Sequence, residues 1–177
     1  MVSVCFIIPA FNAADFIVDT VERALAQDVP GTEVVVVVVD DGTVAVARRY
    51  PQVKVQVQAQ VLTQRTGGDA SARHNGFLST RSDDVIFLDH ADVLHPGAVR
   101  SHLAAFTPGV DMVFGENDLI DAQGRPQGQN RPDVGWSSGR DVALGTTPSF
   151  SQCMYRREHC NASVVFAPMS ASPATTT

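Results

Sequence analysis

Two nearly unbroken apolar runs, Val2–Ile8 and Val34–Val39, restrict the fold of this chain more than any other feature. Both are far shorter than the roughly 20 apolar residues that a membrane-spanning helix needs, and their valine-rich composition is typical of strands. A strand that is apolar at almost every position has to be covered on both faces, as in a parallel sheet between two layers of helices. The two runs therefore predict the central strands of a buried parallel sheet.

Segments with helical spacing alternate with the strand-like runs along the first two thirds of the chain. Ile17, Val21 and Ala24 recur on one helix face, and Asn12 has the side chain of a helix N-cap. This alternation predicts an α/β fold with a mostly parallel, Rossmann-like sheet and helices on both faces. The remaining predicted elements are a helix over 44–50, an edge strand over 53–57, a polar loop over 58–68, a helix over 69–80, a strand over 85–88, a helix from Pro96 to about Phe106, a strand over 111–115 and a hairpin over 118–125.

Composition narrows the classes of function. The chain has 13 Lys and Arg against 19 Asp and Glu, for a net charge of −6, which argues against nucleic acid and anionic membrane surfaces as partners. No run is long enough for a transmembrane segment, no secretory leader is recognisable, and three cysteines without metal-ligand spacing indicate free thiols. We therefore expect a cytoplasmic protein, with peripheral association at the inner membrane face left open.

Polar side chains gather where the predicted strands end. Asn12 follows the first run, Asp40 and Asp41 follow the second, and Asp89 and Asp92 follow the next buried strand. The carboxyl ends of parallel strands meet at one edge of the sheet, where α/β proteins bind ligands. Carboxylates held close together repel, and a divalent cation or the donor groups of a ligand relieve that repulsion. The alternative is structural: each Asp caps the helix that follows it.

Four segments, in the same order, resemble motifs of the family 2 glycosyltransferases. The opening VSVCFIIPAFN is similar to V-S-V-I-I-P-x-Y/F-N, and VVVVDDG, ending at Gly42, is similar to their second strand with its Asp-Asp-Gly. Residues 71–76, SARHNG, resemble the A-R-N-x-G start of a helix, and residues 87–96, FLDHADVLHP, resemble F-L-D-x-D-D-x-x-x-P. The resemblance extends over about residues 2–120.

The resemblance implies a GT-A fold, which is a Rossmann-like nucleotide-binding sheet, and transfer of a sugar from a nucleotide-diphosphate donor with inversion. It also implies roles for individual residues. Pro9, Phe11 and Asn12 would line the nucleotide pocket, Asp41 with Asp40 beside it would accept a hydrogen bond from the base, Arg73 would reach the base or the phosphates, and Asp89 would hold the ribose or the sugar diphosphate.

A divalent cation, Mg or Mn, is also implied by the resemblance. Asp89 is the first candidate ligand, and Asp92 and His90 are further candidates. Ala91 occupies the position of the second Asp in the family's D-x-D motif. A cation here would offset the negative charge that the diphosphate leaving group gains.

No catalytic residue is assigned from the sequence. The family's general base lies in a Glu-Asp-like motif, and no such motif follows Arg157. Because an inverting transfer needs a base for the acceptor proton, we expect a truncated or inactive copy. The expected organisation is a nucleotide-sugar-binding GT-A domain over residues 1–122, a partial acceptor-side region over 123–166 and a disordered tail over 167–177.

Three hypotheses for the function remain open. The first is a glycosyltransferase that uses a nucleotide-diphosphate sugar, such as a UDP-sugar, and an unidentified glycan, lipid or protein acceptor. The second is a catalytically inactive fragment that binds a nucleotide diphosphate. The third is an unrelated doubly wound α/β protein such as a phosphate-receiver domain, which accounts for the Asp residues but not for Pro9–Asn12 or Arg73. Asp83 and Asp84 are assigned no function and are expected to be exposed.

Overall fold

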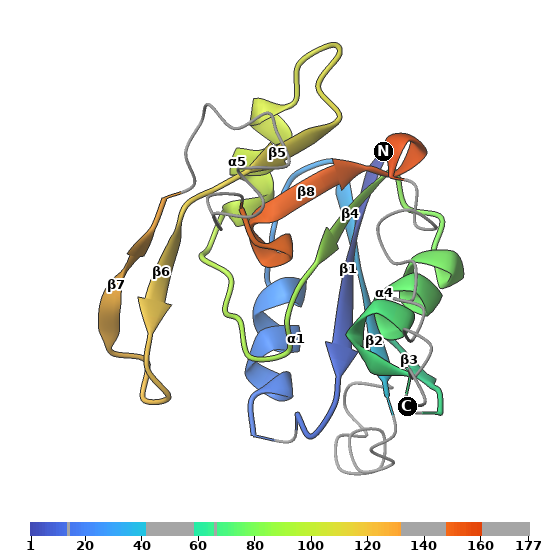
Figure 1. Ribbon diagram of the computed structural model, residues 1–177. Coiled ribbons are helices and arrows are strands. Elements are labelled where there is room, and N and C mark those ends of the chain that lie inside the picture. The colour runs from blue at the N-terminus through green and yellow to red at the C-terminus, as the bar shows by residue number, and fades with distance from the viewer. Residues whose placement is uncertain (14, 42–58, 66, 132–147, 161–177) are drawn as a thin grey trace, which may run out of the picture.

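A computed structural model describes residues 1–13, 15–41, 59–65, 67–131 and 148–160. Its main sheet has six strands in the order β3-β2-β1-β4-β8-β5 (Figure 1). Neighbouring strands are parallel except for β8, which runs antiparallel to both β4 and β5. The strands are β1 (Val2–Ala10), β2 (Thr32–Asp40), β3 (Ala59–Thr63), β4 (Asp84–Phe87), β5 (Met112–Phe114) and β8 (Cys153–Arg156). The predicted mostly parallel α/β sheet is confirmed.

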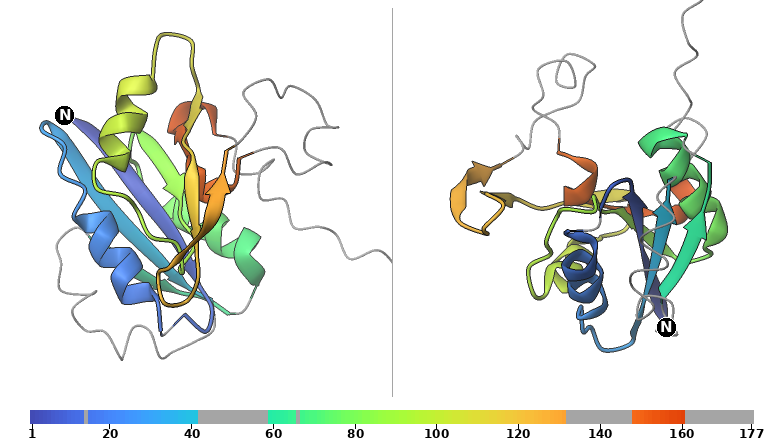
Figure 2. Two further views of the ribbon diagram at one scale, coloured as in Figure 1. Left: turned by 90° about the vertical axis from the view of Figure 1, so that its left-hand side faces the viewer. Right: turned by 90° about the horizontal axis from the view of Figure 1, so that it is seen from below.

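Helices cover both faces of the sheet, as the apolar runs predicted. The helices α1 (Ile17–Leu25) and α5 (Ala98–Ala105) lie on one face and α4 (Gly68–Ser79) lies on the other (Figure 2). Successive residues of β1 point to opposite faces, so Phe6 joins the α1 side of the core and Ile7 joins the α4 side. This alternation explains why β1 is apolar at almost every position.

A glycine in α4 allows the helix to lie close to the sheet. A Cβ atom added at Gly76 would lie only 2.4 Å from Cγ2 of Ile7 and 3.0 Å from Cγ2 of Val39. Both neighbours are buried side chains of the central strands. The absence of a side chain at Gly76 therefore sets the distance between α4 and β1, and with it the position of the residues that α4 carries to the end of the sheet.

Two of the predicted local structures are wrong. The polar segment 58–68 was expected to be a loop, but β3 lies within it and pairs in parallel with β2 from Val36 to Asp40. Asn12 does not cap a helix: α1 begins at Ile17, its N-cap is Phe16 without a side-chain hydrogen bond, and Asn12 has a left-handed backbone with φ 51°. The predicted helix over 44–50, the predicted strand over 53–57 and the tail over 167–177 lie outside the described residues.

The predicted hairpin is present and stands apart from the main sheet (Figure 1). It consists of β6 (Asn117–Ile120) and β7 (Pro126–Asn130), with Asp121 accepting backbone N–H groups in the turn. The domain boundary at residue 122 falls in this turn and stays a prediction. Strand β8 comes from the 123–166 segment and is inserted between β4 and β5, so both segments contribute to one sheet.

Asp84 is buried, contrary to the expectation that it is exposed. Its side chain is inaccessible and accepts hydrogen bonds from Nη1 of Arg156 at 3.1 and 3.3 Å. Burial raises the pKa of Asp84, and Arg156 opposes that shift. The prediction failed because β8 brings Arg156 to β4 from 72 positions away in the chain. Asp83 is exposed, as expected.

No helix in the described part of the chain is long and apolar enough to span a membrane.

Candidate nucleotide-sugar site

The carboxyl ends of β1, β2 and β4 meet at one edge of the sheet, the lower edge in Figure 1. Ala10 at the end of β1 is paired with Asp40 at the end of β2, and the N–H of Asp41 donates to the carbonyl of Ala10 at 3.0 Å. The N–H of Leu88, just after β4, donates to the carbonyl of Ile7 at 3.0 Å. The segments after these three strands therefore leave the sheet at the same rim.

The segment after β1 offers an accessible aromatic ring. Pro9 is buried within the strand, whereas Phe11 is 49% exposed and Asn12 is exposed beside it. A large apolar side chain with this much exposure at a ligand-binding rim is suited to stacking on a planar group. The structure thus places Phe11 and Asn12 at the surface of the rim and Pro9 beneath it.

Asp40 and Asp41 are both buried at the end of β2. The carboxylate of Asp41 accepts hydrogen bonds from Nε2 of Gln64 at 2.6 Å and from the N–H groups of Gly67 and Gly68 at 2.8 Å each. Gly67 is the N-cap of α4 and Gly68 is its first residue, so a negative charge lies at the positive end of that helix. Asp41 therefore caps α4, a helix distant in sequence, and its contact with a base stays a prediction.

Arg73 joins α4 to the segment after β4. Its guanidinium donates from Nη2 to Oδ1 of Asp89 at 2.5 Å and lies 3.5 Å from Oδ2 of Asp69. The Arg73 side chain is 10% exposed, whereas that of Asp89 is 48% exposed. The guanidinium carbon lies 5.2 Å from the ring centroid of Phe150, within the range of a cation–π contact. Two residues that the sequence assigned to one site are thus in direct contact.

Asp89 and Asp92 lie at the two ends of one tight turn. The N–H of Asp92 donates to the carbonyl of Asp89 at 3.0 Å. Ser151 is bonded to this turn, because its Oγ accepts the N–H of Asp89 at 3.1 Å. Although Asp92 reaches solvent, partial burial raises its pKa, the Asp89 charge adds to the rise, and Ser151 opposes it.

The candidate metal ligands form a pair and not a complete cage. Among the described residues no group of three or more His, Cys, Asp or Glu side chains is placed to hold a metal ion. Mg²⁺ at nucleotide sites commonly takes one or two carboxylates together with the substrate phosphates, and Asp89 and Asp92 on one turn match that donor set. His90 is half-buried, and its backbone carbonyl accepts the hydroxyl of Thr20 at 2.8 Å. The carboxylate pair therefore fits a cation shared with a diphosphate.

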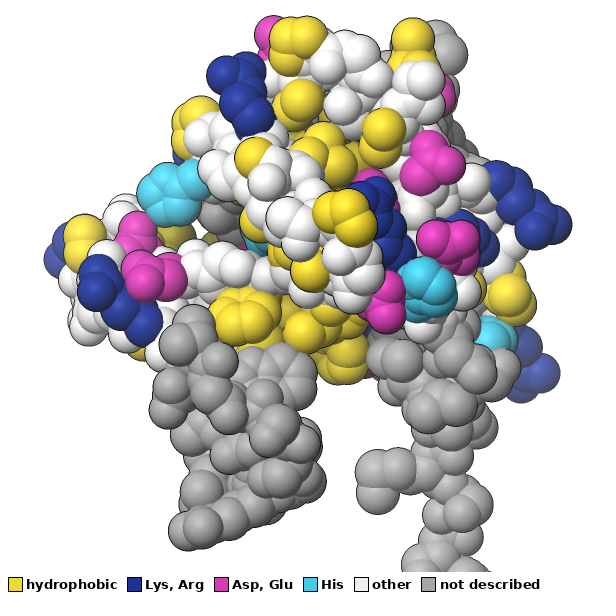
Figure 3. All heavy atoms as spheres, turned by 90° about the horizontal axis from the view of Figure 1, so that it is seen from above, with side chains coloured by type: hydrophobic (Ala, Val, Ile, Leu, Met, Phe, Trp, Pro, Cys, Tyr) yellow, Lys and Arg dark blue, Asp and Glu magenta, His cyan; other side chains and the backbone are white. Residues whose placement is uncertain are grey.

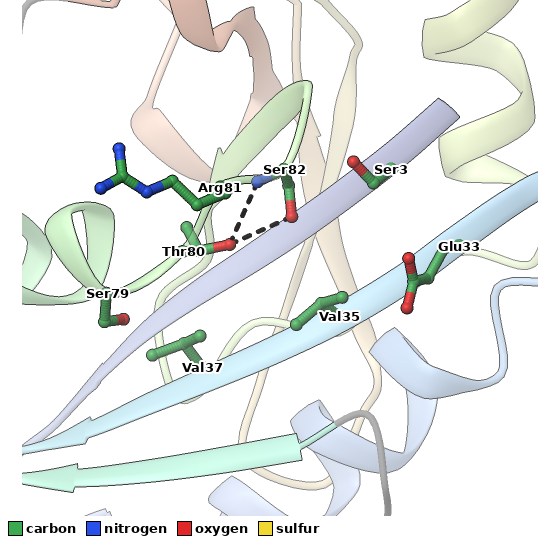
Figure 4. Close-up of a pocket in the computed structure, with 8 residues that line it drawn as sticks. All are labelled: Ser3, Glu33, Val35, Val37, Ser79, Thr80, Arg81 and Ser82. Atoms are coloured by element: carbon green, nitrogen blue, oxygen red, sulfur yellow. Dashed lines mark hydrogen bonds between the residues drawn. The ribbon is translucent and has the colours of Figure 1, made fainter. Parts of the chain in front are cut away.

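Two hollows in the structure lie elsewhere, toward the amino ends of the strands. One, of about 330 Å³, is lined by Ser3, Thr80 and Ser82 among others, and the two hydroxyls of Thr80 and Ser82 are 3.1 Å apart (Figure 4). The other, of about 710 Å³, lies beside Arg81 and Arg157. Basic, acidic and apolar side chains are intermixed on this end of the molecule (Figure 3). We place the site at the opposite rim, because parallel sheets bind ligands at carboxyl ends and the predicted residues converge there.

A short 3-10 turn, η1 (Phe150–Gln152), completes the rim and was missed by sequence reasoning. Ser149 and Gln152 form a reciprocal capping box at its start, with the N–H of Ser149 donating to Oε1 of Gln152 at 2.8 Å. The S-x-x-Q spacing is a recognisable signal for such a turn. Nothing in that spacing indicates that the turn lies against Asp89, since the contact joins residues 62 positions apart.

Comparison with known proteins identifies the family. The sequence model described as "Glycosyl transferase family 2" matches residues 5–162. Among curated relatives, the succinoglycan biosynthesis protein ExoO of Rhizobium meliloti is 32% identical over 127 residues, which cover 69% of this chain and 35% of ExoO. The poly(ribitol-phosphate) beta-N-acetylglucosaminyltransferase TarS of Staphylococcus aureus is 26% identical over 108 residues, which cover 59% of this chain and 19% of TarS.

The fold is likewise shared with solved structures. The crystal structure of S. aureus TarS 1–349 in complex with UDP-GlcNAc superposes with a TM-score of 0.67 at 24% identity, covering 89% of this chain and 46% of that one. The structure in complex with UDP gives a TM-score of 0.63 at 21% identity. This chain therefore has the GT-A fold and belongs to the family 2 glycosyltransferases, which excludes the receiver-domain hypothesis. It spans about a third of the length of ExoO.

Proposed function

We propose that this chain binds a nucleotide-diphosphate sugar at the carboxyl-end rim and forms the donor-binding part of a glycosyltransferase that acts with inversion. One observation carries the proposal: the Arg73–Asp89 ion pair joins α4 to the segment after β4 at the same rim as Asp41. These residues come from three of the four segments that resemble family motifs, and the family match covers residues 5–162.

The proposed contacts follow from exposure and charge. The accessible ring of Phe11 stacks on the nucleotide, with Asn12 beside it and Pro9 shaping the pocket from below. The Asp40–Asp41 pair provides carboxylate acceptors for the base.

The diphosphate lies on the Arg73, Asp89 and Asp92 side of this pocket. Arg73 presents a permanent positive charge toward a leaving group that gains negative charge as the glycosidic bond to the diphosphate breaks. Mg or Mn, held by Asp89 and Asp92 with the phosphates, would supply additional charge compensation. The general base for the acceptor hydroxyl is not among the residues assigned here, and the acceptor, whether glycan, lipid or protein, is not specified by the rim.

Calorimetric titration with UDP, with and without Mn²⁺, tests the proposal. Saturable binding of one UDP per chain is expected, and binding should strengthen when Mn²⁺ is present. A chain that binds UDP but releases no sugar from UDP-GlcNAc or UDP-glucose in the presence of acceptors would support the alternative function, a catalytically inactive nucleotide-diphosphate-binding fragment. A folded chain that binds no UDP under either condition would contradict both.

A cytoplasmic location, with peripheral contact at the inner membrane face, is part of the same proposal. Cys5, Cys153 and Cys160 are free thiols, as expected in a reducing compartment. Burial raises the pKa of both Cys5 and Cys153 to about 11, so these two thiols are unreactive at neutral pH. Fractionation of cells that express the chain, with and without a high-salt wash of the membranes, tests this location.

A further inference from the structure

Gln64 is the first residue after β3, and it brings the end of a fourth strand to the carboxyl-end rim. Thr63, the last residue of β3, is paired with Asp40, and the N–H of Gln64 donates to the carbonyl of Asp40 at 3.0 Å. This bond continues the pairing of β2 and β3 one residue beyond the strand. It therefore places the half-buried side chain of Gln64 beside Asp41.

The side-chain amide of Gln64 joins Asp41 to helix α4. Its Nε2 donates to Oδ1 of Asp41 at 2.6 Å and to Oγ of Ser71 at 3.4 Å, and its Oε1 accepts from Nδ2 of Asn75 at 2.6 Å. Ser71 and Asn75 are four positions apart and share one face of α4. One side chain thus connects the end of β2, the end of β3 and two successive turns of α4.

The direction of these hydrogen bonds follows from the chemistry of the groups. A carboxylate only accepts hydrogen bonds, so Gln64 has to turn its NH₂ group toward Asp41. This orientation leaves Oε1 facing α4, where it needs a donor, and the NH₂ group of Asn75 supplies one. Asn75 therefore orients the amide of Gln64, and Gln64 in turn orients the carboxylate of Asp41.

The Asp41 carboxylate is held from two directions. The N–H groups of Gly67 and Gly68 donate to Oδ1 and Oδ2 from the start of α4, whereas Gln64 donates to Oδ1 from the end of β3. The two backbone donors move with the helix, and Gln64 ties the carboxylate to the edge of the sheet. A ligand-binding group has to be held to within about half an ångström, and the partners of such groups provide that precision.

We propose that Gln64 is a positioning residue for recognition of the base: its amide, oriented by Asn75, fixes the direction of the Asp41 carboxylate and so sets how much the base contributes to nucleotide affinity. This inference rests on the proposed function, in which Asp41 accepts a hydrogen bond from the base. Gln64 acts through Asp41 and needs no contact of its own with the nucleotide. It lies outside the four segments that resemble family motifs.

The experiment measures the affinities of the full chain for UDP and for pyrophosphate by calorimetry, both with Mn²⁺. Pyrophosphate has no base, so it reports on the diphosphate side of the site alone. Gln64→Met keeps the length of the side chain and removes its amide. UDP affinity should fall about 5-fold, the low end for the loss of a buried hydrogen bond, while pyrophosphate affinity stays unchanged.

Asn75→Asp tests the orientation of the amide while leaving Gln64 in place. Asn75 is exposed, so the substitution is compatible with the fold and carries the test if Gln64→Met does not fold. The new carboxylate cannot donate, so Gln64 would turn its NH₂ group toward α4 and its carbonyl toward Asp41. UDP affinity should fall at least as far as in Gln64→Met. Leu78→Asp adds the same charge at another exposed position of α4 and should leave UDP affinity unchanged.

Gln129→Met is the matched control for the loss of a Gln–Asp hydrogen bond. It removes the bond from Nε2 of Gln129 to Oδ1 of Asp118 at 2.9 Å in the hairpin, and UDP affinity should stay unchanged.

UDP affinity in Gln64→Met equal to that of the unchanged chain would overturn the role of Gln64. An equal loss for UDP and pyrophosphate would also overturn it, because that result indicates general damage to the rim. If the unchanged chain binds no UDP, the proposed function fails and this inference fails with it. If the unchanged chain binds UDP and only the Gln64 and Asn75 variants show no effect, the proposed function stands and this inference alone fails.

Discussion

Strand β4 has an Asp–Arg ion pair at each end, and the two pairs differ in burial. At its start, Asp84 is fully buried and bonded to Arg156 at 3.1 Å. Just beyond its end, Asp89 has a side chain that is 48% exposed and is bonded to Arg73. The chemistry is the same, but the first carboxylate is closed off from any ligand and the second is open to one.

This difference separates a structural pair from a functional one. A buried charge is tolerated only with its partner, so Arg156 and Asp84 lock β8 against β4 and stabilise the sheet. A half-exposed pair contributes little to stability, yet it places both a cation and a carboxylate where a diphosphate would lie. The exposure of the acidic partner, more than the presence of the pair, marks the site.

The largest effect is expected from Arg156→Met. The substitution leaves the Asp84 charge buried without its partner. We expect the free energy of unfolding to fall by about 3 kcal/mol, the low end for breaking a buried ion pair, because the Arg156 side chain is itself 33% exposed. Urea unfolding measures it. Arg23→Met, which breaks the exposed pair with Asp19, is the control and should cost about 0.3–0.5 kcal/mol. Comparable losses in the two variants would refute the contrast between the pairs.

Asp41→Ala should affect both stability and binding. The carboxylate caps α4 by accepting the N–H groups of Gly67 and Gly68, so its loss should lower stability by about 1–2 kcal/mol. If the base also donates to Asp41, UDP binding should weaken by about 1–3 kcal/mol. Unfolding and calorimetry on the same samples separate the two effects. A lower thermal midpoint with unchanged UDP affinity would leave Asp41 as a helix cap alone.

Asp89→Asn should weaken UDP binding and have little effect on stability, which is the reverse of the effect expected from Arg156→Met. The half-exposed carboxylate contributes at most about 1 kcal/mol to stability, while UDP affinity in the presence of Mn²⁺ should fall about tenfold, equivalent to about 1.4 kcal/mol. The amide keeps the size of the side chain and removes its charge. A variant that loses stability but keeps its affinity for UDP would place Asp89 with Asp84 as a structural residue.

Ala91→Asp should sharpen the metal part of the account. Ala91 is exposed between Asp89 and Asp92, and a third carboxylate on the same turn adds an oxygen donor. We expect Mn²⁺ affinity at saturating UDP to rise several-fold, with UDP binding weakened in the absence of metal because like charges repel. Ala91→Asn adds a side chain of the same shape as Asp without the charge, so it should weaken UDP binding in the absence of metal little or not at all. An unchanged Mn²⁺ affinity would indicate that the turn does not face the cation.

The smallest expected effect is a change in acid stability at the amino end of the sheet. Donation from the N–H and hydroxyl of Ser3 lowers the pKa of Asp83. The pKa of Asp83 is therefore lower in the folded state than in the unfolded state. The stabilisation that these hydrogen bonds provide is present above the unfolded-state pKa, and it is lost as the pH falls through the folded-state pKa. Ser3→Ala removes one donor, so the midpoint of acid unfolding should shift slightly upward. No shift would mean that the backbone N–H alone accounts for the lowered pKa.

The parts of the fold that depend on local pattern could be predicted from the sequence. The apolar runs of β1 and β2 indicate strands covered on both faces, and the spacing in the first helix places Ile17, Val21 and Ala24 in the core. Arg73 and Asp89 were assigned to one site from motif resemblance, and the structure brings them into contact. Strand β3 was missed because it lies at the sheet edge, where polar residues such as Gln64 follow directly and the apolar signal is weak.

The parts that depend on contacts between distant segments could not be predicted. Burial of Asp84 follows from the insertion of β8, and the backbone N–H of Asp89 is bonded to Ser151, each set by pairing across more than 60 positions. Asp41 illustrates the same limit, since it caps α4 rather than the helix that follows it in sequence. Spacing within a segment carries no information about which other segment will lie beside it.

The central claim is that the donor binds at the carboxyl-end rim, and a crystal structure of the chain with UDP and Mn²⁺ tests it most directly. The account predicts the base near Phe11 and Asp41 and the diphosphate within contact distance of Arg73 and the Asp89–Asp92 turn. Electron density for UDP in the hollow beside Arg81 and Arg157, at the other end of the sheet, would contradict it.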